Sequence, residues 1–159
     1  MAVQSADLKV SIRETITLNN NKYDSFVNHT ITGINEISKR IMTIPTEESQ
    51  TIVNIGGSVA NGGFVSSSIK YVRISNLNDS SNPHHVDLTF QSEDNDEFAV
   101  RLDHGNTFMY PATQTFGVSG SMDAIDANEA NLTQMASLKA VEAKASGSTV
   151  DIELFIAST

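Results

Sequence analysis

The longest run of alternating hydrophobic and polar positions extends over residues 69–110 and predicts a ladder of short β-strands. Successive side chains of a strand point to opposite sides of a sheet, so alternation at period two places each apolar set on one face. Asn, Asp, Ser and Gly fill the turns between the sets. The alternating hydrophobic residues are Ile69 with Tyr71, Val72 with Ile74, Val86 with Leu88 and Phe90, Phe98 with Val100 and Leu102, and Phe108 with Tyr110.

The N-terminal part of the chain begins with the clearest single strand, over residues 7–18. Five apolar residues share one face there, interrupted only by Glu14. Three consecutive Asn residues, 19–21, predict a turn, because Asn tolerates positive φ and caps its own backbone. Residues 23–33 follow no regular pattern but contain Tyr23, Phe26 and Val27. We therefore expect an irregular arm at about residues 19–35 that lies across a neighbouring surface.

The next segment, residues 36–44, has a pattern that fits two structures. Ile31, Ile34, Ile37 and Ile41 recur at helical spacing. Its length and β-branched residues favour a strand that ends at Pro45. A short strand is expected at residues 51–55, followed by a flexible glycine-rich loop over residues 56–63.

The C-terminal third predicts little helix and a last pair of strands. Residues 121–135 have enough spaced apolar positions for one short helix. Val150, Ile152, Leu154 and Ile156 share one face of a final strand. The Ser-Gly-Ser turn at residues 146–148 predicts that this strand forms a hairpin with the strand before it.

Together these elements predict an all-β fold in one domain spanning residues 1–159. Eight or nine short strands, with turns roughly every ten residues, indicate an antiparallel β-sandwich or a jelly-roll-like arrangement, with at most one short helix. The chain shows no internal repeat of fixed length, and the pattern favours this arrangement over a propeller or a βαβ array.

The charge of the chain narrows the classes of partner. Ten Lys and Arg residues against nineteen Asp and Glu residues give a formal net charge of −9. Such a surface repels phosphates and anionic lipid headgroups, so we expect neither nucleic acid nor a membrane as a partner.

The chain has no Cys, which excludes disulfides and thiolate metal sites. Residues 1–10 lack the basic start and apolar run of a secretory leader. No apolar stretch approaches the roughly 20 residues of a membrane helix. We expect a soluble product that stays in the compartment where it is made.

One group of residues resembles a metal-ligand set. His84, His85 and Asp87 are close in sequence, and His104 follows on a later turn. Neutral imidazoles with a carboxylate bind zinc or iron where they converge. The alternative interpretation places them on the solvent face opposite Val86, and the absence of a defined ligand spacing favours it.

Other candidate chemistry is also weak. The acidic run at residues 93–97 would suit calcium, but it lacks the spacing of a calcium-binding loop and fits a solvated hairpin tip. The paired glycines at residues 56–57 and 62–63 lack the Lys and Ser/Thr of a phosphate loop. Ser119 does not sit in a nucleophile elbow. We therefore expect no catalytic residue, no cofactor and no enzyme activity.

Several aromatic residues remain as candidates for contact with a sugar or a partner protein, although core packing explains many such residues. From the predicted arm and the glycine-rich loop we select four partner-contact candidates: Tyr23, Phe26, Val27 and Phe64.

Three internal segments and the C-terminus resemble small structural proteins of tailed bacteriophages, especially those of marine cyanobacterial phages. The internal segments are ISKRIMTIP at 37–45, IKYVRISNL at 69–77 and EFAVRLD at 97–103, and the end is STVDIELFIAST at 148–159. The resemblance covers about residues 36–159, is structural, and carries no catalytic residue across.

The resemblance implies a virion component made in the host cytoplasm. Our first expectation is a capsid decoration (cement) protein that binds the major capsid protein or other virion proteins, as a trimer or dimer. The alternative is a tail or neck component such as a tube, connector or fibre-associated protein. A second alternative is a metal- or glycan-binding β-sandwich module.

Overall fold

The computed structural model describes residues 5–55, 69–93, 95–111, 117–118 and 136–159. Within these ranges it contains strands and no helix, which confirms the all-β prediction. The helix expected over residues 121–135 and the loop at residues 56–63 lie outside the described residues.

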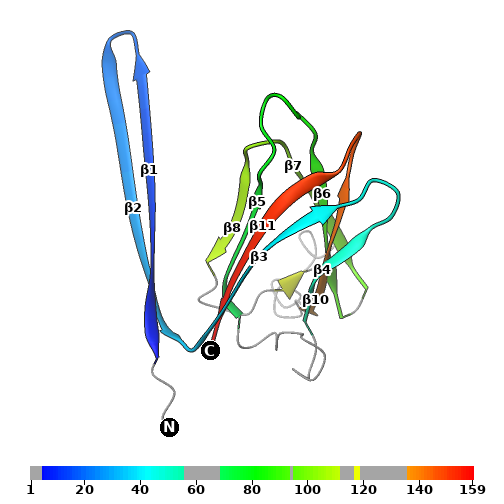
Figure 1. Ribbon diagram of the computed structural model, residues 1–159. Helices are drawn as coiled ribbons and strands as arrows, with labels where there is room; N and C mark the ends of the chain where they lie inside the picture. The colour runs from blue at the N-terminus through cyan, green and yellow to red at the C-terminus, as the bar shows by residue number, and fades with distance from the viewer. Residues whose placement is uncertain (1–4, 56–68, 94, 112–116, 119–135) are drawn as a thin grey trace, which may run out of the picture.

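A β-sandwich forms the body of the protein (Figure 1). One sheet has the order β3-β11-β5-β8, and the other has the order β4-β10-β6-β7, with β9 pairing the start of β10. All the pairs are antiparallel. The bounds are β3 Glu36–Ile44, β4 Gln50–Asn54, β5 Ile69–Asn76, β6 Val86–Ser92, β7 Glu97–Leu102, β8 Thr107–Pro111, β9 Gly117–Val118, β10 Ala136–Ala145 and β11 Val150–Ser158.

The chain passes from one sheet to the other at most connections of the body. Among the described residues, β6 and β7 follow each other within one sheet, as do β9 and β10. Numbered from β3, and leaving out the short β9, the two sheets have the strand order of a jelly roll, a double-sheet fold built from two Greek keys. The sandwich and jelly-roll prediction is therefore confirmed.

The C-terminal hairpin prediction is wrong. β10 pairs with β4 and β6, whereas β11 pairs with β3 and β5 in the opposite sheet. The turn at residues 146–148 does reverse the chain, and Gly147 adopts a φ of +86° there. That turn carries the chain across the sandwich, because the next strand finds its hydrogen-bonding partners in the other sheet.

The core lies between the two sheets and follows the predicted alternation. Val150, Ile152, Leu154 and Ile156 are completely buried, and they face Leu88 and other apolar residues across the sandwich. Phe90 is also fully buried and stacks on Phe98, with ring centroids 4.6 Å apart. Fully burying side chains of this size contributes roughly 1.5–3 kcal/mol each, so the body has its own hydrophobic core.

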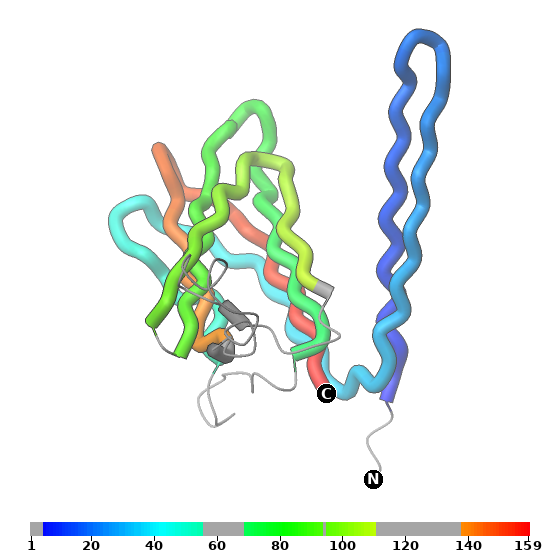
Figure 2. Tube along the Cα trace, turned by 180° about the vertical axis from the view of Figure 1, so that it is seen from behind, coloured from blue at the N-terminus to red at the C-terminus, as the bar shows by residue number. Residues whose placement is uncertain are grey.

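A long hairpin projects from this body (Figures 1 and 2). It consists of β1, Ala6–Leu18, and β2, Asn21–Ile34, which form a separate 2-stranded sheet. The hairpin meets the body near the C-terminus, where the backbone amide of Asn35 donates to the carbonyl of Ser158 at 2.9 Å. We call residues 6–34 the arm.

The arm corrects the predicted irregular segment. Residues 23–33 form a regular strand that pairs with β1 along its length, from Leu18 with Asn21 down to Leu8 with Ile31. The turn itself is as predicted: Asn19 and Asn20 have φ values of 51° and 63°, which is the two-residue reversal that suits a hairpin.

Among the residues that the structure describes, no helix is long and apolar enough to span a bilayer.

Candidate docking surface

The arm has two unlike faces because its strands pair in register. Directly opposed residues point to the same side, so the register Ile12 with Val27 and Ile16 with Tyr23 puts apolar side chains together. The other side carries mostly polar residues, including Lys9, Arg13 and the partners of a 2.8 Å ion pair between Lys22 and Asp24. We call the side of Ile12 and Val27 the arm face; its apolar members are Leu8, Val10, Ile12, Ile16, Leu18, Tyr23, Val27 and Ile31, and the same register places Glu14, Ser25 and His29 among them.

The base of the arm face is packed. Ile31 and Ile34 are buried in a small cluster with Tyr71 and Ala157 of the body, and Leu8, Val10 and Phe155 pack against it. This second cluster is separate from the core between the sheets. It fastens the arm to the outside of the sheet β3-β11-β5-β8.

The outer half of the arm face is exposed. Ile16, Leu18 and Tyr23 retain 57–59% of their surface, and Val27 retains 43%. An isolated two-stranded hairpin is marginally stable at best in water, and a third strand or a packed neighbour is needed to support it. Four large apolar side chains at the end of such a hairpin are the signature of an interaction surface.

The partner-contact candidates from the sequence divide between the two sides of the arm. Tyr23 and Val27 lie on the arm face, whereas Phe26 pairs with Arg13 on the polar side and is 62% exposed. Phe64 lies outside the described residues. The structure thus makes Tyr23 and Val27 part of one continuous surface that Phe26 does not join.

The outside of the sheet beneath the arm is the second half of the site. Along β11, Asp151, Glu153, Phe155 and Ala157 alternate with the core residues and point outward. The registers place Tyr71, Arg73 and Met109 beside Phe155 on one side and Ile37, Lys39 and Ile41 on the other. We call this surface the outer sheet face.

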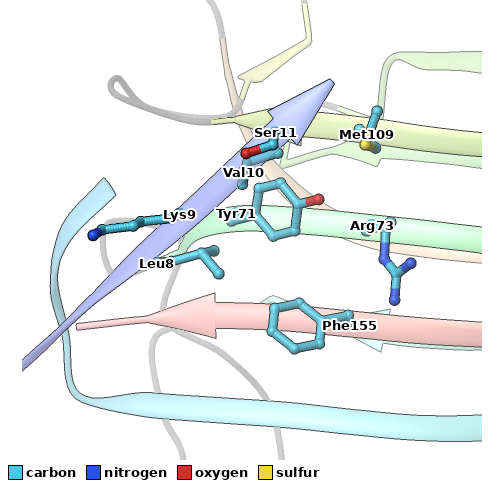
Figure 3. Close-up of a pocket in the computed structure, with 8 residues that line it drawn as sticks. All are labelled: Leu8, Lys9, Val10, Ser11, Tyr71, Arg73, Met109 and Phe155. Carbon is cyan, nitrogen blue, oxygen red and sulfur yellow. The ribbon is translucent and has the colours of Figure 1, made fainter. Parts of the chain in front are cut away.

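A groove runs between the base of the arm and the outer sheet face (Figure 3). Its volume is about 290 Å³, and Tyr71 and Phe155 form its floor with ring centroids 5.9 Å apart in an edge-to-face contact. Burial raises the pKa of the Tyr71 phenol. The eight lining residues are Leu8, Lys9, Val10, Ser11, Tyr71, Arg73, Met109 and Phe155.

The charges on the outer sheet face are paired with one another. Glu153 accepts hydrogen bonds from Lys39, at 2.9 Å, and from Arg73. The Lys39 hydrogen bond, supported by the Arg73 guanidinium, lowers the pKa of the Glu153 carboxyl. Arg73 also lies over the Phe155 ring, 5.9 Å from its centroid. Glu153 therefore compensates part of the positive charge of Lys39 and Arg73, and the apolar side chains beside these ion pairs remain available for contact.

Two isoleucines on this face are exposed without an obvious structural reason. Ile37 and Ile41 on β3 are 59% and 65% exposed, and Met109 on β8 is 38% exposed. Sequence analysis identified β3 correctly but did not identify this patch, because alternation shows that two faces exist and not which neighbour covers each. A signal in the sequence that could have indicated it is the apolar Phe155, which lies between the core positions Leu154 and Ile156.

The metal-ligand candidates do not assemble. His85 Nε2 lies 3.9 Å from Asp87 Oδ2, but Asp87 also accepts a hydrogen bond from Arg101 at 3.3 Å. His84 packs against Gly147 instead. His104 follows β7 in a turn, and no group of three or more His, Asp or Glu residues within the described ranges is arranged to hold a metal ion.

Comparison with known proteins adds no relative: no family model, no curated protein and no solved structure matches this chain.

Proposed function

We propose that this protein is a non-enzymatic structural subunit of a virion, in the first place a capsid decoration protein that adheres to the head lattice. The observation that carries the proposal is the outer half of the arm face, where Ile16, Leu18, Tyr23 and Val27 are all exposed on a projecting hairpin. A subunit that works by adhesion needs such a preformed apolar surface, since buried area supplies most of the binding free energy.

The body supports the same role by analogy. Jelly rolls occur in viral capsid proteins, and also in lectins and cupins. The fold is therefore compatible with a virion role but does not determine the function. In this chain the space between the sheets is filled by core residues such as Phe90, Leu88 and Leu154. Recognition therefore takes place on the outside of the body and on the arm.

A tail or neck subunit is the second candidate. The arm face and the outer sheet face are different surfaces of one subunit, and contact between unlike surfaces is heterologous, which builds rings when it closes and tubes when it propagates. This separation of the two surfaces is the observation that favours the alternative.

Immunogold labelling of intact phage particles with antibody against this chain tests the proposal. Label spread over the head is expected for a decoration protein. Label confined to the neck or tail would move the protein to the second candidate. Particles that stay unlabelled before and after mild disruption would overturn the virion role.

A further inference from the structure

We infer that the arm face docks on the outer sheet face of a second copy of this chain. The inference rests on the proposed function, because it takes the arm to be an assembly element, and it names the partner of that element. Three observations carry it: an existing contact of the same kind, compatible lengths of the arm and of β3, and the distribution of charge.

The first observation is the contact at the base of the arm. Leu8 and Val10 of the arm face, and Phe155 of the outer sheet face, already pack against one buried cluster that contains Tyr71, within one chain (Figure 3). The two surfaces are thus compatible in shape and chemistry where they meet. Both continue beyond this contact as exposed apolar surface, toward Tyr23 on the arm and toward Ile41 on the sheet. A second copy brings the two exposed parts together.

The second observation is length. At about 3.4 Å per residue, the 13 residues of β1 span about 44 Å. The part beyond Ile12 is about half of that, and β3, with 9 residues, is about 30 Å long. The free part of the arm is therefore shorter than β3 and fits along the part of this strand on which Ile37 and Ile41 are exposed.

The third observation is charge. The arm contains three basic residues, Lys9, Arg13 and Lys22, and three acidic residues, Asp7, Glu14 and Asp24, so its formal charge is zero. The whole net charge of −9 lies in the rest of the chain. Two acidic bodies repel each other, whereas a neutral arm approaches an acidic body without that cost. On the outer sheet face itself, Glu153 is already paired with Lys39 and Arg73.

Cross-linking between two single-cysteine variants tests the contact, since the native chain has no Cys. Ser25→Cys places a thiol on the same side of the arm as Tyr23 and Val27 while retaining both. Thr43→Cys places one beside Ile41 on the outer sheet face. The two purified variants, one of them isotopically labelled, are mixed and treated with a short bismaleimide. Mass spectrometry then counts only the products that join different copies.

Two control mixtures use matched positions. Thr15→Cys lies on the polar side of the same arm, and Thr51→Cys is exposed on β4 of the opposite sheet. We expect the Ser25→Cys and Thr43→Cys mixture to give a large excess of mixed dimer over a mixture with either control. Equal yields in all three mixtures would overturn the inference.

Sedimentation velocity gives a second readout without cross-linking. Tyr23→Ser and Ile41→Ser should each weaken self-association at least about tenfold, which corresponds to about 1.4 kcal/mol and is modest for a buried anchor residue. Thr15→Ser should leave it unchanged. Circular dichroism checks that both variants are folded, as expected for changes at exposed positions. A native chain that is monomeric throughout the concentration series would contradict the inference.

The experiments distinguish failure of the proposed virion role from failure of the proposed contact between copies. Particles labelled on the head, together with no mixed cross-link, would leave the virion role in place and remove the second copy as the partner of the arm. A strong mixed cross-link with unlabelled particles would support the contact between copies and overturn the virion role.

Discussion

The body and the arm are built from the same alternating pattern but differ in what covers their apolar side. In the body, Leu154 and the other core residues of β11, Val150, Ile152 and Ile156, face a second sheet and have no exposed surface. In the arm, Ile16 and Tyr23 lie on a single layer and retain more than half of their surface. The alternating pattern therefore specifies a strand with an apolar and a polar face. The apolar face is buried only where a second layer packs on it. The body supplies its own second layer, whereas the arm needs one from outside.

The largest difference should appear when one phenylalanine is truncated in each region. Phe90→Ala removes a fully buried ring that stacks on Phe98 and also contacts Phe108, and we expect a loss of about 3–5 kcal/mol in the free energy of unfolding. Phe26→Ala on the arm should change it by less than about 0.5 kcal/mol. Urea unfolding followed by circular dichroism measures both values. Similar losses in the two variants would show that the arm belongs to the folding unit of the body.

Substitution of one glycine in each region compares the stability of the body with that of the arm. Gly147, with a φ of +86°, packs so closely on the His84 ring that an added Cβ would approach its Nδ1 atom to 2.5 Å. Gly33, with a φ of +77°, has no atom within 4 Å of that position. Left-handed backbone alone costs a non-glycine residue roughly 1–2 kcal/mol, and Gly147→Ala adds a clash to this cost.

Gly147→Ala should therefore lower the unfolding free energy of the body by more than the roughly 1–2 kcal/mol of the left-handed backbone alone. Gly33→Ala should mainly destabilise the arm. Hydrogen exchange resolved by mass spectrometry separates the two effects. Faster exchange throughout β11 and β3 in Gly33→Ala would mean that the junction supports the body as well.

A stabilising change at the tip tests whether the arm is an independent hairpin. A two-residue turn with positive φ at both positions favours Asn-Gly, so Asn20→Gly should stabilise the arm. Slower hydrogen exchange in β1 and β2, with no change in β6 or β11, is the expected result. No change in the arm would indicate that contacts at its base alone set its stability.

The smallest expected effect concerns the ion pairs on the outer sheet face. The pKa of Glu153 is lower in the folded protein than its ordinary value of 4.5, so its pairing stabilises the fold fully above that pH. This contribution is lost as the pH falls through the lower pKa of the folded protein. Glu153→Gln should therefore be slightly less stable than the native chain at neutral pH, by under about 1 kcal/mol, as exposed pairs are.

The difference between the native chain and Glu153→Gln should disappear in acid, which urea unfolding over a pH series measures. A difference that grew as the pH fell would have the opposite sign and would contradict the lowered pKa.

The sequence predicted the elements whose pattern is set locally. The strand at residues 36–44 ends at Pro45 as expected, and the alternation of Val150, Ile152, Leu154 and Ile156 gave the core side of β11. The prediction for residues 23–33 was wrong because the positions on the arm face alternate between apolar and polar residues, with Ser25 and His29 as the polar ones. The segment therefore lacks the simple apolar–polar alternation of a strand. Pairing with β1 imposes the regular strand, and a neighbouring strand is not visible in the segment itself.

The sequence also did not predict which strands pair when they are far apart along the chain. The Ser-Gly-Ser turn predicted a reversal, which occurs, but not that β10 and β11 enter opposite sheets. In the same way, Tyr23 and Val27 were chosen as contacts from their residue type, while Ile37 and Ile41 were assigned only to a strand. Their exposure depends on what covers the outer face of the sheet, and the sequence of β3 alone does not contain that information.

Removal of the arm tests most directly whether assembly and folding are divided between the two regions. Residues 35–159 and the full chain would be compared by sedimentation equilibrium and by urea unfolding. We expect the full chain to associate with rising concentration, and the shortened chain to remain monomeric, β-rich and cooperatively folded. A shortened chain that still associates, or that no longer folds, would contradict the division between a self-sufficient body and an arm that needs a partner.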